Sequence, residues 1–320
     1  MKTINWGILG SANIAGNQFI PGLHLAEGNQ LQAVASRTKE KAEAFAQKHG
    51  IPKAYGSYDE LLNDPNVDAV YIALPNHLHV EWSLKAMEKG KHVLCEKPLA
   101  LKSEDVKKVK EYSDTYNVCF MEAFMYQFHP QWKRAIDCIK SGLIGDIRII
   151  RSQFSFPLGD RSNIRLNPEM GGGSLYDVGC YCVHSSHLLV NQEPEKVQAI
   201  AHFNENQVET SLSGLIQYPN GVLVHFDSSF EATDRQYVEI TGFKGSLQIP
   251  FPFRPDKGEP KIIYQGVEGY WEERVEDTNI YREEILYFSN CIRENKNPTE
   301  HLERTYTVSK IIESLYLALD

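Results

Sequence analysis

The first 120 or so residues alternate short apolar segments with longer segments of helical periodicity. The apolar segments, typical of β-strands, lie at residues 4–9, 31–35, 69–73, 91–95 and 118–121. Segments whose apolar residues recur at helical spacing lie at 39–48, 78–89 and 103–115. This alternation constrains the fold strongly, because parallel strands need helical crossovers that cover both faces of their sheet. It predicts an α/β fold whose amino-terminal part is a doubly wound parallel sheet of the Rossmann type.

The pattern changes after residue 122. A helical segment at 131–141 is followed by longer alternating segments at 147–156, 196–203, 214–218, 222–228 and 237–241, and helices are expected at 280–293 and 305–318. The turn signal Pro219-Asn220-Gly221 separates two of these strands, which favours a large, open, mostly antiparallel sheet. Because 320 residues exceed what one core usually organises, we expect two domains, 1–122 and 123–320, with the last helices able to pack back on the first.

Charge and composition narrow the class of protein. The chain has 33 Lys and Arg against 42 Asp and Glu, a net charge of -9, which argues against nucleic acid or an anionic membrane as the main partner. No apolar run is long enough for a membrane helix, and a strand-like segment begins at Ile4, so we expect a cytoplasmic protein. The six cysteines follow no disulfide pattern, and we expect them reduced and mostly buried.

The turn after the first strand has the spacing of a dinucleotide-binding loop. It reads Gly10-Ser11-Ala12-Asn13-Ile14-Ala15, and it fits Gly-x-Gly-x-x-Gly only with Ala12 and Ala15 in the second and third glycine positions. A helix that begins here could bind a pyrophosphate with its free N–H groups and its dipole. The alternative is an ordinary strand-to-helix turn, and the sequence of the loop by itself fits both interpretations equally well.

The end of the second strand bears on the choice of cofactor. An NAD-preferring loop would carry an acidic residue there, whereas this chain has Ser36, Arg37 and Lys41. A hydroxyl and two cations suit a 2'-phosphate, so NADP is favoured over NAD. The alternative is that Arg37 and Lys41 are the solvated start of a helix.

Three motifs, in this order, resemble those of the glucose-fructose oxidoreductase, inositol dehydrogenase and rhizopine-catabolism (Gfo/Idh/MocA) family. They are Leu74-Pro75-Asn76-His77-Leu78-His79, Glu96-Lys97-Pro98, and Asp177-Val178-Gly179-Cys180-Tyr181. The resemblance covers essentially the whole chain. The run Gly171-Gly172-Gly173, the segment Met121-Glu122-Ala123-Phe124 and Tyr at 181 are similar to the branch of NADP-dependent sugar oxidoreductases and dihydrodiol dehydrogenases.

The resemblance implies a Rossmann domain, a substrate-binding and oligomerisation domain with an open sheet, and a cofactor between them. It also implies a homo-oligomer, a dimer or tetramer, formed through the outer face of that sheet. The implied cofactor contacts are Gly10, Ser11, Ala12, Asn13 and Ile14 for the pyrophosphate, Ser36, Arg37 and Lys41 for the adenosine phosphate, Leu74, Pro75, Asn76, His79, Glu96 and Lys97 for the nicotinamide half, and Arg165 and Tyr281 in addition.

The expected chemistry is hydride transfer between nicotinamide C4 and a sugar, sugar derivative or vicinal diol. Asp177 and Tyr181 are four residues apart, on one face if the segment is helical. Tyr181 is the expected acid or base, since a nearby cation lowers a phenol pKa from about 10 towards the working range. Lys97 would stabilise the developing alkoxide and Asp177 would orient the substrate or the lysine. The alternative from a different class is a catalytically silent dinucleotide-binding regulator.

A metal site is not expected. His77 with His79, or His184 and His187 with Cys180 and Cys182, lack the paired spacing of a structural zinc site. Hydride transfer to a nicotinamide needs no metal ion.

Overall fold

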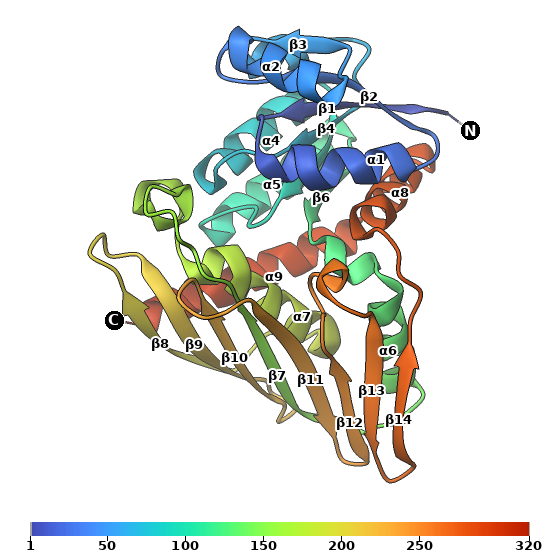
Figure 1. Ribbon diagram of the computed structural model, residues 1–320, viewed down its shortest axis with the longest axis vertical. Coiled ribbons are helices and arrows are strands. Elements are labelled where there is room, and N and C mark those ends of the chain that lie inside the picture. The colour runs from blue at the N-terminus through green and yellow to red at the C-terminus, as the bar shows by residue number, and fades with distance from the viewer. Residues whose placement is uncertain (1, 320) are drawn as a thin grey trace. The chain divides into compact units, whose positions relative to one another are not determined.

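The computed structural model describes residues 2–319 and divides into two compact units (Figure 1). The first unit contains residues up to Met125 together with Asn279–Tyr306, and the second contains Tyr126–Thr278 together with the residues from Thr307 on. Helix α9 (Thr299–Leu317) therefore contributes residues to both units.

The first unit is built on a six-stranded parallel sheet. Its strands are β1 (Ile4–Leu9), β2 (Asn29–Ala35), β3 (Lys53–Tyr55), β4 (Ala69–Ile72), β5 (His92–Glu96) and β6 (Phe120–Ala123), in the order β3-β2-β1-β4-β5-β6. The order reverses between β1 and β4, and ligands of such sheets bind outside the carboxyl ends of the strands at this point.

Helices connect these strands, and their ends follow local chemistry. They are α1 (Ile20–Leu25), α2 (Lys39–His49), α3 (Tyr58–Leu62), α4 (His79–Glu88) and α5 (Ser103–Tyr116). Helix α8 (Ile280–Arg293) comes from a later part of the chain and packs against α1 in the same unit. Thr38 caps α2 by accepting the N–H of Lys41, and Gly50 ends that helix in the left-handed conformation that glycine adopts without strain. Ser57 caps α3 in the same way, accepting the N–H of Glu60.

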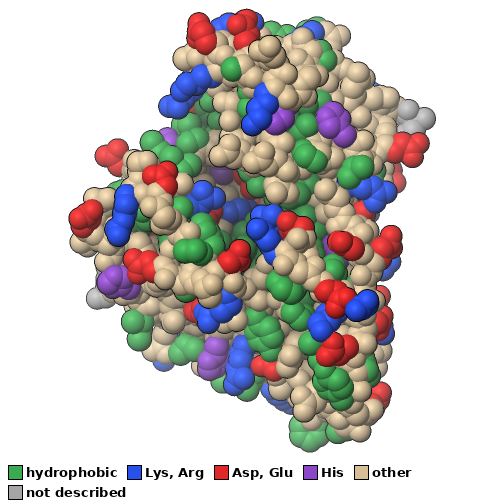
Figure 2. Space-filling view, in the orientation of Figure 1, with side chains coloured by type: hydrophobic (Ala, Val, Ile, Leu, Met, Phe, Trp, Pro, Cys, Tyr) green, Lys and Arg blue, Asp and Glu red, His purple; other side chains and the backbone are tan. Residues whose placement is uncertain are grey.

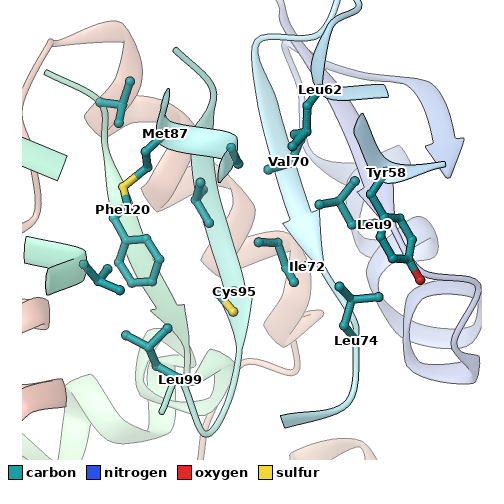
Figure 3. Packing of buried hydrophobic residues seen from close by; sticks show 14 of the residues in the cluster. Leu9, Tyr58, Leu62, Val70, Ile72, Leu74, Met87, Cys95, Leu99 and Phe120 are labelled. Atoms are coloured by element: carbon teal, nitrogen blue, oxygen red, sulfur yellow. The ribbon is translucent and has the colours of Figure 1, made fainter. Parts of the chain in front are cut away.

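The core of the first unit consists of the apolar strands and the helices packed on them. Every residue of β4 is fully buried, as expected for a strand covered on both faces. Figure 3 shows the Phe120 ring between Met87 and Leu99, with Cys95 nearby on the neighbouring strand. These contacts anchor the strand ends from which the loops of the candidate site emerge.

The second unit is built on an eight-stranded sheet. Its strands are β7 (Ile147–Ser155), β8 (Lys196–Phe203), β9 (Glu209–Gln217), β10 (Leu223–Ser229), β11 (Arg235–Gly242), β12 (Gly245–Ile249), β13 (Lys261–Gly266) and β14 (Gly269–Arg274). The order is β14-β13-β12-β11-β7-β10-β9-β8, and neighbours are antiparallel except for the parallel pair β7 and β10.

Helices cover only one face of this sheet. Helices α6 (Pro130–Lys140) and α7 (Cys180–Val190) lie behind the strands in Figure 1. Residues therefore alternate along each strand: Leu212 and Ile216 of β9 are buried, whereas Leu215 is 45% exposed. Ile200 of β8 is 80% exposed, and the uncovered face is hollowed by about 710 Å³ beside it.

The face of the molecule drawn in Figure 2 shows no large patch of a single sign of charge. Figure 2 shows acidic and basic side chains interspersed there. None of the helices between residues 2 and 319 is both long and apolar enough to cross a membrane.

The predicted fold class is confirmed: a parallel Rossmann-type sheet and a separate, mostly antiparallel sheet. The prediction missed β3, α3 and the strands β12 to β14. Strand β3 has only three residues, and the exposed strand β14 has few buried apolar positions to show its period. Several boundaries also differ from the prediction: β2 begins at Asn29, β6 at Phe120, β9 at Glu209 and α9 at Thr299.

Candidate active site

The loop after β1 makes a tight turn into a helix. Gly10 has φ +100°, and a Cβ there would lie 2.7 Å from the carbonyl oxygen of Ala73, so only glycine fits. The helical segment that continues into η1 (Ala15–Phe19) and α1 begins at Asn13, directly after Ser11 and Ala12. Such a helix start presents N–H groups without intrahelical partners, as a pyrophosphate requires.

The second strand ends beside this loop. The hydroxyls of Ser11 and Ser36 lie 3.3 Å apart, which joins the ends of β1 and β2. Ser36 is buried, whereas Arg37 and Lys41 are exposed, with their side chains accessible to an anion. The structure thus places a hydroxyl and two cations at the end of β2 and no acidic residue among Ser36, Arg37 and Thr38.

His79 connects the loops that follow β4 and β5. Its Nδ1 is 2.8 Å from the carbonyl oxygen of Pro98, and its Nε2 is 2.7 Å from that of Leu74. Burial lowers the pKa of His79 to about 4, against the effect of these carbonyls, so near neutral pH the ring donates from one nitrogen at a time. The side chain predicted as a nicotinamide contact therefore lies behind the loops, and Pro75, Asn76 and Lys97 are more exposed. The Lys97–Pro98 peptide bond is cis.

Glu96 and Tyr281 lie close to one buried tyrosine. The hydroxyl of Tyr71 donates a hydrogen bond to Oε1 of Glu96. Burial, with Glu96 and Tyr281 nearby, raises the pKa of Tyr71 well above its usual value. Tyr281 is buried against Gly22 of α1, where an added Cβ would be 2.6 Å from the Cβ of Tyr281. Among the predicted cofactor contacts, Tyr281 is thus a packed residue of the first unit.

Glu122 is a buried acid that lies in the motif segment Met121–Phe124 but was not predicted as a site residue. Its Oε1 accepts the N–H of Leu99 at 2.7 Å, and its Oε2 accepts the hydroxyl of Thr305 at 2.8 Å. Burial raises its pKa to about 7, opposed by these two donors and by Lys97, while Glu96 adds to the increase. A further sequence signal is a charged residue inside the apolar strand β6.

The second unit contains the Asp177 segment. Asp177 lies in the π-helical turn η6 (Leu175–Gly179), which leads directly into α7. Nε of Arg165 donates to Oδ2 of Asp177 at 2.6 Å, a charge-assisted bond that fixes the carboxylate. Arg165, predicted as a cofactor contact, therefore has Asp177 as a partner within its own unit.

The glycine run before η6 is required by close contacts. A Cβ on Gly172 would lie 2.6 Å from the carbonyl oxygen of Arg165. Gly173 has φ +129°, and a Cβ there would lie 2.2 Å from Oε2 of Glu209. Glu209 was also missed by sequence analysis, because nothing in its local pattern distinguishes it from a surface acid.

Glu209 is buried and bonded to two donors. Its Oε1 accepts the N–H of Leu175 at 2.7 Å and the hydroxyl of Tyr316 at 3.0 Å. Burial raises the pKa of Glu209 to about 7, and both bonds oppose the increase.

Aromatic rings surround Tyr181. Its ring centroid lies 5.4 Å from those of Phe154 and Phe253 and 5.8 Å from that of Tyr126. The hydroxyl of Tyr126 lies 2.5 Å from Nδ1 of His184, one turn further along α7. Tyr181 is 5% exposed, so its ring is fixed by packing.

Each unit thus groups a different part of the predicted set. The first unit brings together the loops that carry Gly10, Ser36, Leu74 and Lys97, and the second brings together Arg165, Asp177 and Tyr181. Between residues 2 and 319, no three His, Cys, Asp or Glu side chains are grouped so as to bind a metal ion.

Models of known protein families match the two parts of the chain separately. Residues 4–124 match the model of an oxidoreductase family with an NAD-binding Rossmann fold, and residues 132–248 match the GFO/IDH/MocA C-terminal domain. The chain belongs to the Gfo/Idh/MocA oxidoreductase family. The family resemblance inferred from the three motifs is confirmed, and the protein is an oxidoreductase of this family.

Several relatives are similar over nearly their full length. A D-xylose 1-dehydrogenase (NADP(+)) from Haloferax volcanii is 36% identical, with 97% of this chain and 96% of the relative covered. A trans-1,2-dihydrobenzene-1,2-diol dehydrogenase from Mus musculus is 33% identical, with 99% and 97% covered. A 3-ketoreductase from Actinomadura kijaniata, crystallised with NADP and TDP-benzene, superimposes with a TM-score of 0.93 at 27% identity and covers 99% of this chain and 98% of its own.

Two of the buried acids, Glu122 and Glu209, predict how stability depends on pH. Each has a pKa of about 7 in the folded protein, against an ordinary value of 4.5, so between these values the folded state binds more protons than the unfolded state. The free energy of unfolding should therefore fall as pH rises from about 4.5 to 7, by up to about 1.4 kcal/mol for each unit of pKa difference. Glu122→Gln should make this dependence less steep in denaturant titrations across that range.

Asp64 supplies the matched control. Burial raises the pKa of Asp64, but hydrogen bonds from Lys53, Asn66 and Tyr55 outweigh burial and lower it far below its usual range. Its stabilising effect is therefore lost only in acid, so Asp64→Asn should leave the slope between pH 5 and 7 as in wild type. An unchanged slope in Glu122→Gln would contradict the assignment.

Proposed function

We propose that the protein is an NADP-dependent oxidoreductase that moves a hydride between nicotinamide C4 and a carbinol or carbonyl carbon of a sugar, a sugar derivative or a vicinal diol. The observation that carries this proposal is the fixed arrangement in η6 and α7, where Asp177 is paired with Arg165 and Tyr181 is packed among aromatic rings one turn later. The relatives, an NADP-dependent xylose dehydrogenase and a dihydrodiol dehydrogenase, support this substrate class.

The residues at the first two strand ends fit NADP. At Gly10 the chain packs too closely against Ala73 for a side chain, which fixes the tight turn into a helix whose first N–H groups are available to a pyrophosphate. Ser36 provides a hydroxyl, and Arg37 and Lys41 provide exposed positive charge for the 2'-phosphate. Pro75, Asn76, Glu96 and Lys97 are the proposed contacts of the nicotinamide half.

A bound nicotinamide would donate or accept the hydride. In the oxidising direction, the Tyr181 phenolate accepts the proton of the substrate hydroxyl. The Lys97 ammonium stabilises the negative charge that develops on that oxygen, and the Asp177 carboxylate, fixed by Arg165, orients a substrate hydroxyl group. The rings of Phe154, Phe253 and Tyr126 hold the phenol ring of Tyr181 in one orientation.

The catalytic roles are tested by substitution. Lys97→Ala and Tyr181→Phe should each lower kcat by about 10²-fold or more, since each removes a group that acts on the transferred proton or its charge. NADPH absorbance is followed with D-xylose and a panel of aldoses, ketoses and vicinal diols. Lys102→Ala and Tyr176→Phe are matched controls, being a neighbouring exposed lysine and a tyrosine of η6 outside the proposed machinery.

Two results would count against the proposal. Near wild-type kcat in both variants would remove Lys97 and Tyr181 from the mechanism. Tight NADPH binding by the wild-type protein without oxidation or reduction of any panel member would favour a dinucleotide-binding regulator.

The cofactor preference is tested at Arg37. Arg37→Asp replaces a cation with a carboxylate, which should repel the 2'-phosphate and accept hydrogen bonds from the ribose hydroxyls of NAD. We expect the ratio of NADP to NAD affinity to fall by about 10-fold or more, as for loss of one charge-assisted contact. Lys48→Asp, at the exposed far end of α2, is the control of equal charge change. An unchanged ratio in Arg37→Asp would remove Arg37 from phosphate recognition.

We further propose that the uncovered face of the eight-stranded sheet binds the same face of a second copy. Ile200, Leu215 and Leu223 are exposed on this face although they are apolar, which indicates a surface that becomes buried. A two-fold contact between identical sheet faces would bury each of them in both copies.

A charged residue placed on the sheet face tests the proposed contact between two copies. Ile200→Asp should shift the protein to monomers in analytical ultracentrifugation, since the contact would bury an unpaired carboxylate in each copy. Phe243→Asp changes an equally exposed apolar residue in the turn between β11 and β12 and should leave the assembly intact. A wild-type monomer, or an Ile200→Asp oligomer of wild-type mass, would contradict the proposal.

A further inference from the structure

Two buried carboxyl groups, Glu122 and Glu209, form hydrogen bonds to the backbone next to the proposed catalytic side chains. Neither was assigned a role above. Each accepts a backbone N–H at 2.7 Å, and each also accepts a side-chain hydroxyl of α9, from Thr305 in one case and Tyr316 in the other. The same arrangement thus occurs once within each unit.

Glu122 is bonded to the segment that carries Lys97. Strand β6 pairs with β5, and Glu122 lies opposite Cys95, two residues before Lys97. Its Oε1 bonds to the N–H of Leu99, two residues after Lys97, while Thr305 holds Oε2. The bond from the Leu99 N–H to Oε1 fixes the chain after Lys97, and the pairing of β5 with β6 fixes the chain before it.

Glu209 is bonded to the segment that carries Asp177 and Tyr181. The N–H it accepts belongs to Leu175, the first residue of η6. The carboxylate lies so close to Gly173 that any side chain there would collide with it. The start of η6 is therefore fixed by Glu209 from one side, and this start sets the direction of the helix that follows.

An acid is a costly way to fill these positions. A buried carboxyl group must give up hydration, whereas a methionine of similar size would pack without that loss. Packing alone therefore does not account for two buried acids, and what both have in common is a backbone N–H beside a proposed catalytic residue. We propose that Glu122 and Glu209 are positioning residues: Glu122 fixes the backbone that carries Lys97, and Glu209 fixes the backbone that carries Asp177 and Tyr181. This inference rests on the proposed function.

The test compares two near-isosteric substitutions at each site. Glu122→Met and Glu209→Met fill the same space but cannot accept the N–H bond, whereas Glu122→Gln and Glu209→Gln keep an amide oxygen that can. We expect the Met variants to lower kcat by about 10- to 100-fold, the scale for small displacement of a reacting group. The KM for NADPH should stay unchanged in Glu209→Met, because the segment that Glu209 fixes carries no proposed nicotinamide contact, and should rise in Glu122→Met, because Lys97 is such a contact. The Gln variants should recover most of the lost kcat. Turnover of the best panel sugar by the full chain is measured alongside thermal unfolding of each variant.

Two controls separate positioning from support of the fold. Thr305→Val and Tyr316→Phe remove the hydroxyl donors but leave the backbone N–H bonds, so they should lower stability with little change in kcat. A Met variant with wild-type kcat would overturn the proposal for that residue. A Gln variant as slow as its Met counterpart would overturn the backbone role in favour of the charge.

Hydrogen exchange of the wild-type protein tests the proposal without any variant and without an activity assay. The Leu99 and Leu175 amides should exchange as slowly as the strand amides of β6 and β9, because buried acceptors protect them. Fast exchange of either amide would overturn the proposal for its acid. If the wild-type protein turns over no panel substrate, the proposed function fails, whereas the exchange result still decides whether the two acids fix these segments.

Discussion

The position of the buried His79 ring between two loops is the constraint on which the first half of the site depends. The two ring nitrogens lie 2.8 Å and 2.7 Å from the backbone carbonyl oxygens of Pro98 and Leu74, and the neutral ring donates to one of them at a time. The buried ring is therefore in contact with the loops after both β4 and β5 and restrains their movement. The core beneath them, with Phe120 between Met87 and Leu99, fixes the strand ends from which both loops start. A ligand bound at this edge of the sheet would therefore meet a surface organised before binding, which reduces the entropy lost on association.

The second unit achieves the same rigidity by different means. Arg165 fixes the Asp177 carboxylate from one side, while Glu209 accepts the N–H at the start of η6. Glycines at 172 and 173 allow the backbone to come this close to carbonyl and carboxylate oxygens, and any larger residue would push the segment away. The glycine run visible in the sequence is thus a consequence of close packing around the proposed catalytic turn.

Sequence reasoning recovered what depends on local pattern. Strand and helix periods identified both sheets, and the motif order identified the family, because these signals lie in contiguous residues. It did not recover contacts between distant residues. Arg165 and Asp177 are separated by twelve positions, and their bond depends on how the intervening loop folds. The packing of Tyr281 against Gly22, more than two hundred residues earlier in the chain, is another contact that no local pattern indicates.

The two acids show why such residues escape motif analysis. A carboxylate usually indicates solvent, a cation or catalysis. Glu122 lies in an apolar strand and in the motif segment Met121–Phe124, but this position does not say that it accepts a backbone N–H, and the segment around Glu209 carries no signal at all. Their burial also has a cost, since both have pKa values of about 7 and their ionised forms oppose folding near neutral pH. Two core positions that lower stability in this way are understandable if the backbone they fix must not move. In that case the rigidity of the proposed site, and not the stability of the fold, explains why the acids are there.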